Sequence, residues 1–469
     1  MNATQQYLEQ LFANGNLPVT EARNKLLQQF CQDEVNSKAV TEILTYQNML
    51  MDKWQLFNRI TTIQEQPFTI PNATAGKPYE AVIDRDQQGW VDMEVIELNG
   101  LEDTGLQYDA ETGSITGTPT AHGDRKLVLR YRLQQEPEEA EPHEKSIPLV
   151  INPNPRLLWK NLGSDATDLY WKEDDIAFTA PLGGKLLVAA SKRGRSHANT
   201  GGFRDDDIAY GHFGQTGWSV IAVADGAGSA PLARQGAKLA VNAVVNYFTP
   251  ALTGDGLPEL ELLLQEYNHG TGADTQKKLN QQIYTHLGKA ALYAHKQLEA
   301  FAHTKEVALK DLHSTLLFVL LKQFAFGYAV LSFSVGDGVI GLVNTDQTAA
   351  MLMNRLDVGE FGGGTRFITM PEIFKNELFY TRFGCKVVDD FSHLFLMTDG
   401  IFDPKFVTEA ALEKPEKWQE LIRDLAGENE DGKKVELSPD NTQVAEELSA
   451  WMDFWSAGNH DDRTLAIVF

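Results

Sequence analysis

Apolar residues in the first 65 or so positions recur at the three- and four-residue spacing of helices. The positions concerned are Leu8, Leu11, Phe12, Leu26, Leu27, Phe30, Ile43, Leu44, Met49 and Leu50. No grouping of catalytic residue types accompanies them. The pattern predicts a helical module over residues 1–65, whose apolar faces pack within the protein or cover a neighbouring domain or partner.

From about Pro67 the pattern changes to the two-residue alternation of strands, with turn residues between the strands. Residues 81–84 and 127–131 show this alternation clearly. The acidic run at 136–142 is interpreted as a solvated loop between the last two strands. Proline and asparagine at 152–155 mark a linker, so this all-β region is expected to end there.

Residues 98–123 contain a Thr-Gly turn followed by Gly117, Pro119 and Gly123. This segment resembles the immunoglobulin-like repeats found in many bacterial proteins. The resemblance covers about 85 residues and implies a small immunoglobulin-like β-sandwich over 66–153. Such a domain implies interaction or spacing and no particular reaction.

After about Leu158 strand and helix patterns alternate to the end of the chain. Strands are predicted at 185–191, 218–224, 314–322, 326–335, 338–343, 393–398 and 463–469, and helices at 232–248, 277–303, 406–426 and 440–456. One helix has a continuous apolar stripe that suits packing on a sheet: Leu279, Ile283, Leu287, Ala291, Ala294, Leu298 and Phe301. The fold class is therefore α+β, with a helix-covered β-sandwich (αββα) over residues 165–469.

The chain is acidic, with 65 acidic and 41 basic residues and a formal charge of −24. This charge repels phosphodiester backbones and anionic membrane surfaces and favours cations. Nucleic acid and membranes are therefore not expected as partners. Only Cys31 and Cys385 occur, which excludes a disulfide framework or a cysteine-based zinc site. No apolar run reaches the ~18 residues of a membrane helix, so a soluble cytoplasmic protein is expected.

Four short aspartate motifs lie beside apolar, strand-like runs in the last 250 or so residues. Three are Asp-Gly pairs beginning at Asp225, Asp337 and Asp399, and the fourth is Asp461-Asp462. A single Asp-Gly pair is the commonest signal of a tight turn. Their shared position at strand ends instead favours one site, because carboxylates suit a hard cation and glycine lets the backbone approach it. Several such ends can hold two ions.

Six motifs in order between residues 165 and 469 resemble the metal-dependent protein phosphatases of type 2C, which dephosphorylate phosphoserine and phosphothreonine. The motifs are 204–207 (Arg-Asp-Asp-Asp), 223–228 (Val-Ala-Asp-Gly-Ala-Gly), 314–316 (Ser-Thr-Leu), 336–338 (Gly-Asp-Gly), 398–403 (Thr-Asp-Gly-Ile-Phe-Asp) and 461–464 (Asp-Asp-Arg-Thr). The resemblance implies that 165–469 is a type 2C catalytic domain.

By this resemblance, Asp225 bridges two Mg²⁺ or Mn²⁺ ions and the backbone carbonyl of Gly226 completes one coordination sphere. Asp206 binds one ion directly or through water, with Asp205 and Asp207 as alternatives because three consecutive aspartates leave the register open. The other implied ligands are Asp399 and Asp461 for the second ion, and Asp337 and Asp403 for a looser third ion. Paired cations ~4 Å apart acidify a bridging water toward a pKa of ~7 and neutralise charge on the phosphate.

A phosphate dianion also needs a positive side chain, and guanidinium can hold two phosphate oxygens at once. Arg195 is the first choice for this catalytic contact, with Arg193 and Arg204 as rivals. A basic surface turn is the alternative interpretation for each of them.

The sequence departs from the family pattern in three places. Ala227 stands where many members have a histidine proposed to protonate the leaving alkoxide; metal-bound water is the preferred acid here, with His197 and His212 as alternatives. Residues 199–202 lengthen the loop before Asp206, and His313 replaces a glycine without an evident reason.

The leading interpretation is a serine/threonine phosphatase that hydrolyses a phosphorylated protein substrate by a metal-activated water. A cognate serine/threonine kinase is a further expected partner. The alternatives are a non-catalytic phosphatase-like scaffold that binds phosphoproteins, and a metal-dependent hydrolase of small phosphorylated molecules.

Overall fold

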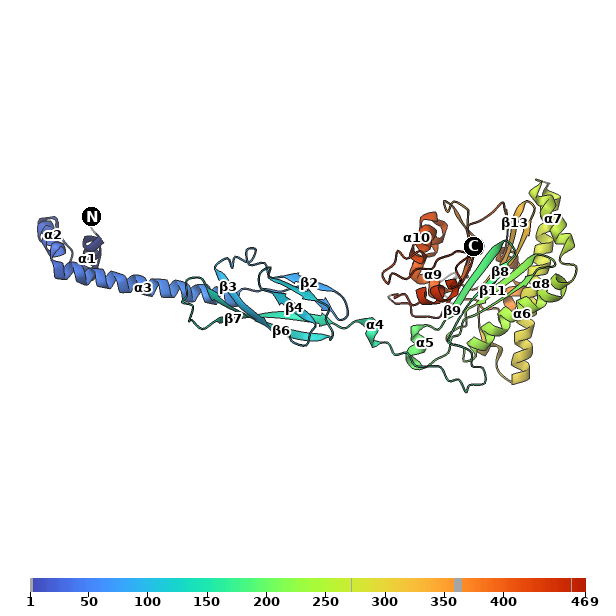
Figure 1. Cartoon of the computed structure of the whole chain (residues 1–469), viewed down its shortest axis with the longest axis horizontal. Coiled ribbons are helices and arrows are strands. Elements are labelled where there is room, and N and C mark those ends of the chain that lie inside the picture. Colours follow the sequence, from blue (N-terminus) through green and yellow to red (C-terminus); the bar gives the residue numbers. More distant parts are fainter. Residues whose placement is uncertain (1–2, 271, 358–364, 457) are drawn as a thin grey trace. The chain divides into compact units, whose positions relative to one another are not determined.

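The structure is a computed structural model that describes residues 3–270, 272–357, 365–456 and 458–469. The chain divides into two compact units, Met1–Leu158 and Trp159–Phe469 (Figure 1). Within the described residues, no helix combines the length and the apolar character needed to cross a bilayer.

Unit 1 begins with three helices, α1 (Ala3–Asn14), α2 (Asn24–Gln32) and α3 (Glu34–Glu65), with a 3₁₀ turn at Glu21–Arg23. The side chain of Asp33 caps α3 by accepting the backbone N–H groups of Val35 and Asn36 at 3.0 and 3.1 Å. This contact satisfies two of the donors that a helix leaves free at its start. A sharp boundary therefore separates α2 from the much longer α3.

The rest of unit 1 consists of two sheets around one core. Strand order is β1-β7-β6-β3 in the first sheet and β2-β5-β4 in the second. The bounds are β1 Ala73–Thr74, β2 Tyr79–Val82, β3 Met93–Asn99, β4 Leu106–Asp109, β5 Ser114–Gly117, β6 Gly123–Leu133 and β7 His143–Asn152. Lys145 of β7 donates to the carbonyls of Ile63 and Gln66 at 2.7 and 2.6 Å, and so attaches the end of α3 to this sheet. A lysine at the last carbonyls also suits the helix dipole.

Unit 2 contains a five-stranded and a six-stranded antiparallel sheet. Their strand orders are β10-β11-β12-β13-β16 and β15-β14-β17-β18-β9-β8. The bounds are β8 Asp175–Leu182, β9 Lys185–Lys192, β10 Asp207–Phe213, β11 Trp218–Ala224, β12 Leu316–Phe324, β13 Gly327–Val335, β14 Val339–Val343, β15 Ala350–Leu352, β16 Phe383–Val388, β17 His393–Met397 and β18 Arg463–Val468. Every residue of β11, β17 and β18 is buried, as expected of central strands covered on both faces.

Three apolar clusters occupy successive layers of unit 2. The first packs the helices α6 (Ala233–Thr253), α7 (Pro258–Asn268) and α8 (Ala273–Lys305) on the five-stranded sheet. The second joins residues of both sheets, and the third packs α9 (Asp399–Phe406), α10 (Pro415–Leu425) and α11 (Val444–Trp451) on the six-stranded sheet. The short helix α4 (Pro155–Leu158) ends unit 1, and unit 2 contains the short helix α5 (Arg195–Thr200).

The predicted mixture of helices and sheets is confirmed, and the strand predicted at 218–224 has these bounds in the structure. The helix predicted at 406–426 is wrong. Val407 has a positive φ of 67°, which ends α9, and Pro415 starts a new helix after a short 3₁₀ turn. Within the helix predicted at 440–456, the structure has only the shorter helix α11. Strands β8, β10 and β16 and helix α7 were not predicted, because their apolar spacing is short or interrupted.

Candidate metal centre

The predicted aspartates lie at neighbouring ends of strands in both sheets. Asp225 follows β11 and Asp337 follows β13 in one sheet, while Asp399 follows β17 and Asp461 precedes β18 in the other. The edge is held together by Thr315, whose hydroxyl accepts the backbone N–H of Asp225 at 2.9 Å and whose backbone N–H donates to the carbonyl of Asp225 at 2.8 Å. Antiparallel pairing of β11, β12 and β13 therefore brings carboxylates distant in sequence to one edge.

Asp225, Asp337 and Asp399 each place a carboxylate oxygen within 4.8 Å of the other two. Burial, together with the charges of Asp206 and Asp399, raises the pKa of Asp225 well above its ordinary value. Burial and the charges of Asp337 and Asp461 likewise raise the pKa of Asp399. Such a group is unfavourable when ionised unless a cation neutralises it.

Asp206 contributes a fully buried carboxylate to this cluster. Its Oδ2 accepts hydroxyl hydrogen bonds from Thr398 and Thr464, both at 2.8 Å. Its Oδ1 is buried and has no hydrogen-bond donor among the described residues, and the same holds for Oδ1 of Asp337 and of Asp399. Buried acceptors without donors are rare. An all-oxygen set of this kind fits a hard divalent cation such as Mg²⁺ or Mn²⁺.

The two neighbours of Asp206 have other partners. Asp207 pairs with the buried ammonium of Lys172 at 2.9 Å, and Asp205 lies 3.8 Å from the ring of His197. Lys172 also donates to the carbonyl of Asp206 at 2.6 Å, and burial lowers its pKa to about 8. Of the three consecutive aspartates, Asp206 is the one whose charge most raises the pKa of Asp225. Sequence reasoning missed Lys172, which lies more than 30 residues upstream with no motif around it.

Gly226 and Asp403 border the cluster. A side chain at Gly226 would lie 2.8 Å from the carbonyl oxygen of Asp205 and 2.9 Å from Ala233. Only glycine therefore fits between the backbone of Asp205 and the start of α6 without a shift of one of them. Asp403 lies one helical turn after Asp399 in α9, and burial and the charge of Asp337 raise its pKa.

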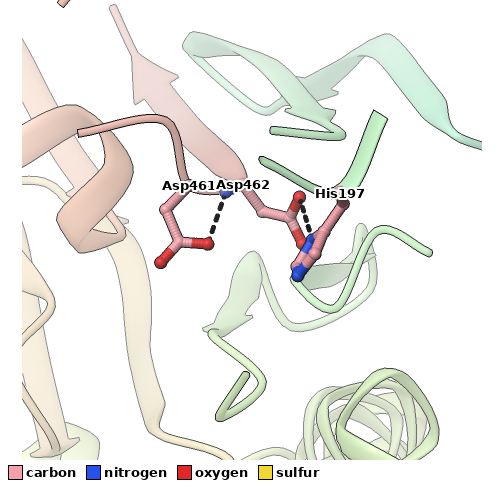
Figure 2. A group of neighbouring side chains, drawn as sticks. All are labelled: His197, Asp461 and Asp462. Atoms are coloured by element: carbon pink, nitrogen blue, oxygen red, sulfur yellow. Dashed lines mark hydrogen bonds and ion pairs between the residues drawn. The ribbon is translucent and has the colours of Figure 1, made fainter. Parts of the chain in front are cut away.

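The successive carboxylates of Asp461 and Asp462 point in different directions (Figure 2). Asp461 accepts the backbone N–H of Asp462 at 2.8 Å, whereas Asp462 lies 3.0 Å from Nδ1 of His197. Asp462 also accepts the backbone N–H groups of Gly194 and Asp205. Burial opposes ionisation of Asp462, but these hydrogen bonds hold its pKa below the ordinary value. Asp462 thus joins three separate chain segments beside the cluster.

His197, one of the two alternative acids, is half-buried beside the cluster. It lies in α5 with its side chain 23% exposed, and the hydrogen bond to Asp462 raises its pKa to about 9. Oxygen or nitrogen atoms of His197, Asp461 and Asp462 lie within 4.8 Å of one another. The ring is thus placed for a charge-assisted hydrogen bond with the buried carboxylate of Asp462. The sequence pointed to this pair only through the Asp461-Asp462 doublet, and the sequence analysis assigned no role to Asp462.

The three candidate arginines already have protein partners. Arg193 donates to the carbonyl of Gly202 at 2.8 Å and pairs with Asp174 at 3.1 Å. Arg204 is buried and donates to the carbonyl of Asp206 at 2.7 Å, which positions that residue. Arg195 donates to the carbonyl of Asp453 and lies 5.5 Å from the ring of Trp455.

The remaining histidines have local contacts. His313 stacks on Phe367 with ring centroids 4.8 Å apart, and its Nδ1 lies 2.6 Å from the hydroxyl of Thr369. This explains the histidine at position 313, which connects the start of β12 to the segment after residue 365. His212 lies within β10, where its Nδ1 is 2.9 Å from the hydroxyl of Ser219.

Comparison with known proteins gives a family match and several matches to solved structures. The family model described as "Protein phosphatase 2C" matches residues 193–453. A search of curated protein sequences finds no match to this chain. The serine/threonine phosphatase PstP/Ppp of Mycobacterium tuberculosis is 14% identical, with coverage of 60% of this chain and 97% of that one and a TM-score of 0.34. Stp1 of Staphylococcus aureus is 14% identical, with coverage of 66% and 98% and a TM-score of 0.33.

Two further solved structures contain metal ions according to their descriptions. The catalytic domain of PstP in complex with two manganese ions is 15% identical and has a TM-score of 0.35, with 60% of this chain and 96% of that chain covered. RsbX in complex with magnesium is 11% identical, with coverage of 62% and 98% and a TM-score of 0.33. The assignment rests on the family model, which spans more than half of the chain and includes the motifs around Asp206, Asp225, Asp337 and Asp399. The chain therefore belongs to the protein phosphatase 2C family of phosphoprotein phosphatases.

Proposed function

We propose that the chain is a metal-dependent serine/threonine protein phosphatase that hydrolyses phosphoserine and phosphothreonine in protein substrates. The observation that carries the proposal is the convergence of Asp206, Asp225, Asp337 and Asp399, three of which have a buried oxygen without a donor. A scaffold without catalysis would have no need to gather mutually repelling carboxylates. The family match supports the enzymatic interpretation.

We assign Asp225 to a position between two Mg²⁺ or Mn²⁺ ions, with Gly226 offering its carbonyl. The solved PstP catalytic domain is described with two manganese ions, which supports a paired site here. The other proposed ligands are Asp206 with the first ion, Asp399 and Asp461 with the second, and Asp337 and Asp403 with a looser third.

When bound, the paired ions would supply an ionised water for in-line attack, a proton source for the leaving alkoxide and positive charge for the phosphate oxygens. The chain's own residues fix the geometry. Thr398 and Thr464 occupy Oδ2 of Asp206 and leave its buried Oδ1 without a donor. Arg204 and Lys172 both donate to the carbonyl of Asp206.

Arg195 remains our proposed phosphate contact because Arg193 and Arg204 are committed to buried or paired positions. Its guanidinium would have to exchange the carbonyl of Asp453 for phosphate oxygens. A charge of −24 repels a phosphate dianion, so the ions and this guanidinium would have to reverse the local field.

We propose three levels of organisation around this activity: a helical segment at 1–65, an immunoglobulin-like sandwich at 66–153 and an αββα catalytic domain at 165–469. The two sheets of unit 1 share one buried core, and the helices and sheets of unit 2 form successive packed layers. We also propose a cytoplasmic location, a phosphoprotein substrate and a cognate serine/threonine kinase as partner.

The test is phosphate release with Mn²⁺ from phosphoserine and phosphothreonine peptides, beside p-nitrophenyl phosphate, ATP and a sugar phosphate. We expect peptide hydrolysis that EDTA abolishes and that falls at least a hundredfold in Asp399→Asn, because a metal ligand is lost. Asp346→Asn, in an exposed turn, is the matched control. Equal rates for Asp399→Asn and the control would refute the metal mechanism, and preference for ATP or sugar phosphate would refute the protein substrate.

A further inference from the structure

Large apolar side chains are exposed far more densely in the N-terminal helices than elsewhere. Twelve of the twenty-nine exposed large hydrophobic residues of the described chain lie between Leu11 and Phe57, a tenth of its length. Exposed apolar patches of this kind mark interaction surfaces. By contrast, the apolar cluster that α1, α2 and α3 form among themselves contains only four buried residues: Leu8, Leu27, Cys31 and Val40. A core of this size is too small for a helical module, so further burial is needed.

The exposed residues form a stripe along α3, which we define as Ile43, Tyr46, Leu50, Trp54 and Phe57. Their exposed fractions are 43, 64, 63, 64 and 62%. Spacings of three, four, four and three residues place all five on one helix face.

A different face of the same helix packs on the β-sheet core of unit 1. It includes Ile63, which is fully buried there, with Leu56 and Ile60 beside it. The stripe is therefore not required to attach α3 to the sheets. A groove of about 780 Å³ between α1 and α3 is lined by Ile43, Tyr46 and Leu50 of the stripe, together with Leu11 and Met51.

The spacing of the stripe residues along the sequence is symmetric about Leu50. Two antiparallel copies of α3 related by a twofold axis at Leu50 would place Ile43 opposite Phe57 and Tyr46 opposite Trp54. A twofold interface requires such a self-complementary surface. We propose that this stripe is a homodimer interface, in which α3 packs antiparallel on α3 of a second copy of the chain.

The charges near the stripe permit this arrangement. Residues 1–65 carry seven acidic and five basic side chains, a net charge of −2 in a chain of −24. The antiparallel register sets Lys53 opposite Gln47 and Glu42 opposite Asn58, so no like charges face each other across it. The part of the chain with this apolar surface thus carries little of the negative charge that would oppose self-association.

The area is sufficient for a small but specific interface. Five large side chains at these exposures offer about 100 Å² apiece, and two copies together therefore bury on the order of 1,000 Å². Specific interfaces begin at about this size. Leu11 and Met51 of each copy would add to it.

The first test measures the mass of the full chain in solution by sedimentation equilibrium from 1 to 100 μM. We expect twice the chain mass for the wild type, and a shift to the single-chain mass for Leu50→Glu, because two carboxylates would meet on the axis. Leu262→Glu, an equally exposed leucine of α7, is the matched control and should remain dimeric. Leu50→Glu should keep the wild-type circular dichroism and phosphatase rate, which separates this proposal from the catalytic one.

The second test fixes the register without disrupting the surface. Leu50→Cys should form a disulfide-linked dimer when treated with diamide, because position 50 meets itself on the axis. Ile43→Cys alone should not, but should crosslink when mixed with a Phe57→Cys chain. The wild type, with Cys31 buried and Cys385 half-buried, measures background crosslinking.

Several results would overturn the proposal. A monomeric wild type at 100 μM would refute it. Binding of the stripe to lipid vesicles or to the chain's own catalytic unit would then be the explanation for its exposure. A dimer that survives Leu50→Glu would place the interface elsewhere. Crosslinking of Ile43→Cys to itself would show a parallel pair and refute the antiparallel register.

Discussion

Replacing Asp225 by asparagine should stabilise the metal-free protein and at the same time remove its stabilisation by metal. Asp225, Asp337 and Asp399 bring carboxylate oxygens within 4.8 Å of one another. Asparagine has nearly the same shape as aspartate but carries no charge. The substitution therefore removes repulsion from the empty site together with a ligand from the occupied one.

The size of the effect follows from the geometry. Two unit charges 4.8 Å apart repel by about 3.5 kcal/mol at an effective dielectric constant of 20. Asp225 takes part in two such pairs, so full ionisation gives about 7 kcal/mol of repulsion. Holding one carboxyl protonated instead costs about 5 kcal/mol at pH 7.5, at 1.36 kcal/mol for each pH unit above an ordinary aspartate pKa. We therefore expect Asp225→Asn to gain about 2–5 kcal/mol without metal, after allowance for partial solvent access.

The assay is thermal unfolding of EDTA-treated protein, followed by the same measurement with increasing Mn²⁺. For a unit of this size the gain corresponds to a rise in Tm of roughly 3–8 °C without metal. Mn²⁺ should raise the Tm of the wild type steadily, since a ligand that binds only the native state stabilises it. The Tm of Asp225→Asn should hardly change, so the two curves cross. Asp346→Asn should follow the wild type under both conditions.

A Tm for metal-free Asp225→Asn below that of the metal-free wild type would contradict the reasoning. It would show that the Asp225 carboxyl stabilises the fold through hydrogen bonds that asparagine does not replace. An equal response of both proteins to Mn²⁺ would show that the ions bind elsewhere. The activity assay alone cannot separate these cases from simple unfolding.

Three other predictions test separate parts of the structure. Thr398→Val should weaken Mn²⁺ binding by about tenfold or more in calorimetry, because Asp206 loses an orienting hydroxyl; Thr398→Ser should restore it. Burial lowers the pKa of His393 to about 4, so the unfolded chain binds a proton more readily between pH 6.5 and 4 and stability falls as pH falls across that window. The free energy of unfolding falls by up to about 3 kcal/mol. In denaturant unfolding, the stability of His393→Gln should depend less on pH than that of the wild type. Gly341→Ala would place a carbon 1.9 Å from Trp418 and should cost about 1–3 kcal/mol, whereas Gly214→Ala, with open space around it, should cost less than 1 kcal/mol in the same assay.

Several features of the site were predictable because they depend on local chemistry. An aspartate followed by glycine at the end of an apolar run needs no tertiary information to be noticed. That Asp225, Asp337 and Asp399 meet follows once β11, β13 and β17 are recognised as central strands, since their ends lie at one edge. Asp206 was selected among three aspartates by the family pattern, and the structure buries that residue in the cluster.

The contacts that orient these carboxylates were not predictable. Asp462 binds the backbone of Gly194 and the ring of His197 across more than 260 residues. Thr464 reaches Asp206 over 258 residues. No spacing rule relates such positions, because they meet where the chain enters β18 beside the end of β9.

The arginines show the limit of reasoning from residue type. Three guanidiniums occur close together in sequence, and each is chemically able to bind phosphate. In the structure Arg204 instead supports the backbone of Asp206, and Arg193 pairs with Asp174. Burial and pairing, which sequence does not display, separate structural arginines from a candidate for substrate binding.

The site draws its carboxylates from both sheets of unit 2, and this sets a mechanical requirement on the fold. Asp225 and Asp337 belong to the five-stranded sheet, while Asp399 and Asp461 belong to the six-stranded one. Repulsion among them acts to separate the sheets at this edge. The apolar cluster between the sheets opposes that separation, and the hydroxyls of Thr398 and Thr464 connect the second sheet to Asp206, next to the first strand of the other. A cation bound by all of these carboxylates would therefore add to the attraction between the sheets, and its binding would be coupled to the stability of the domain.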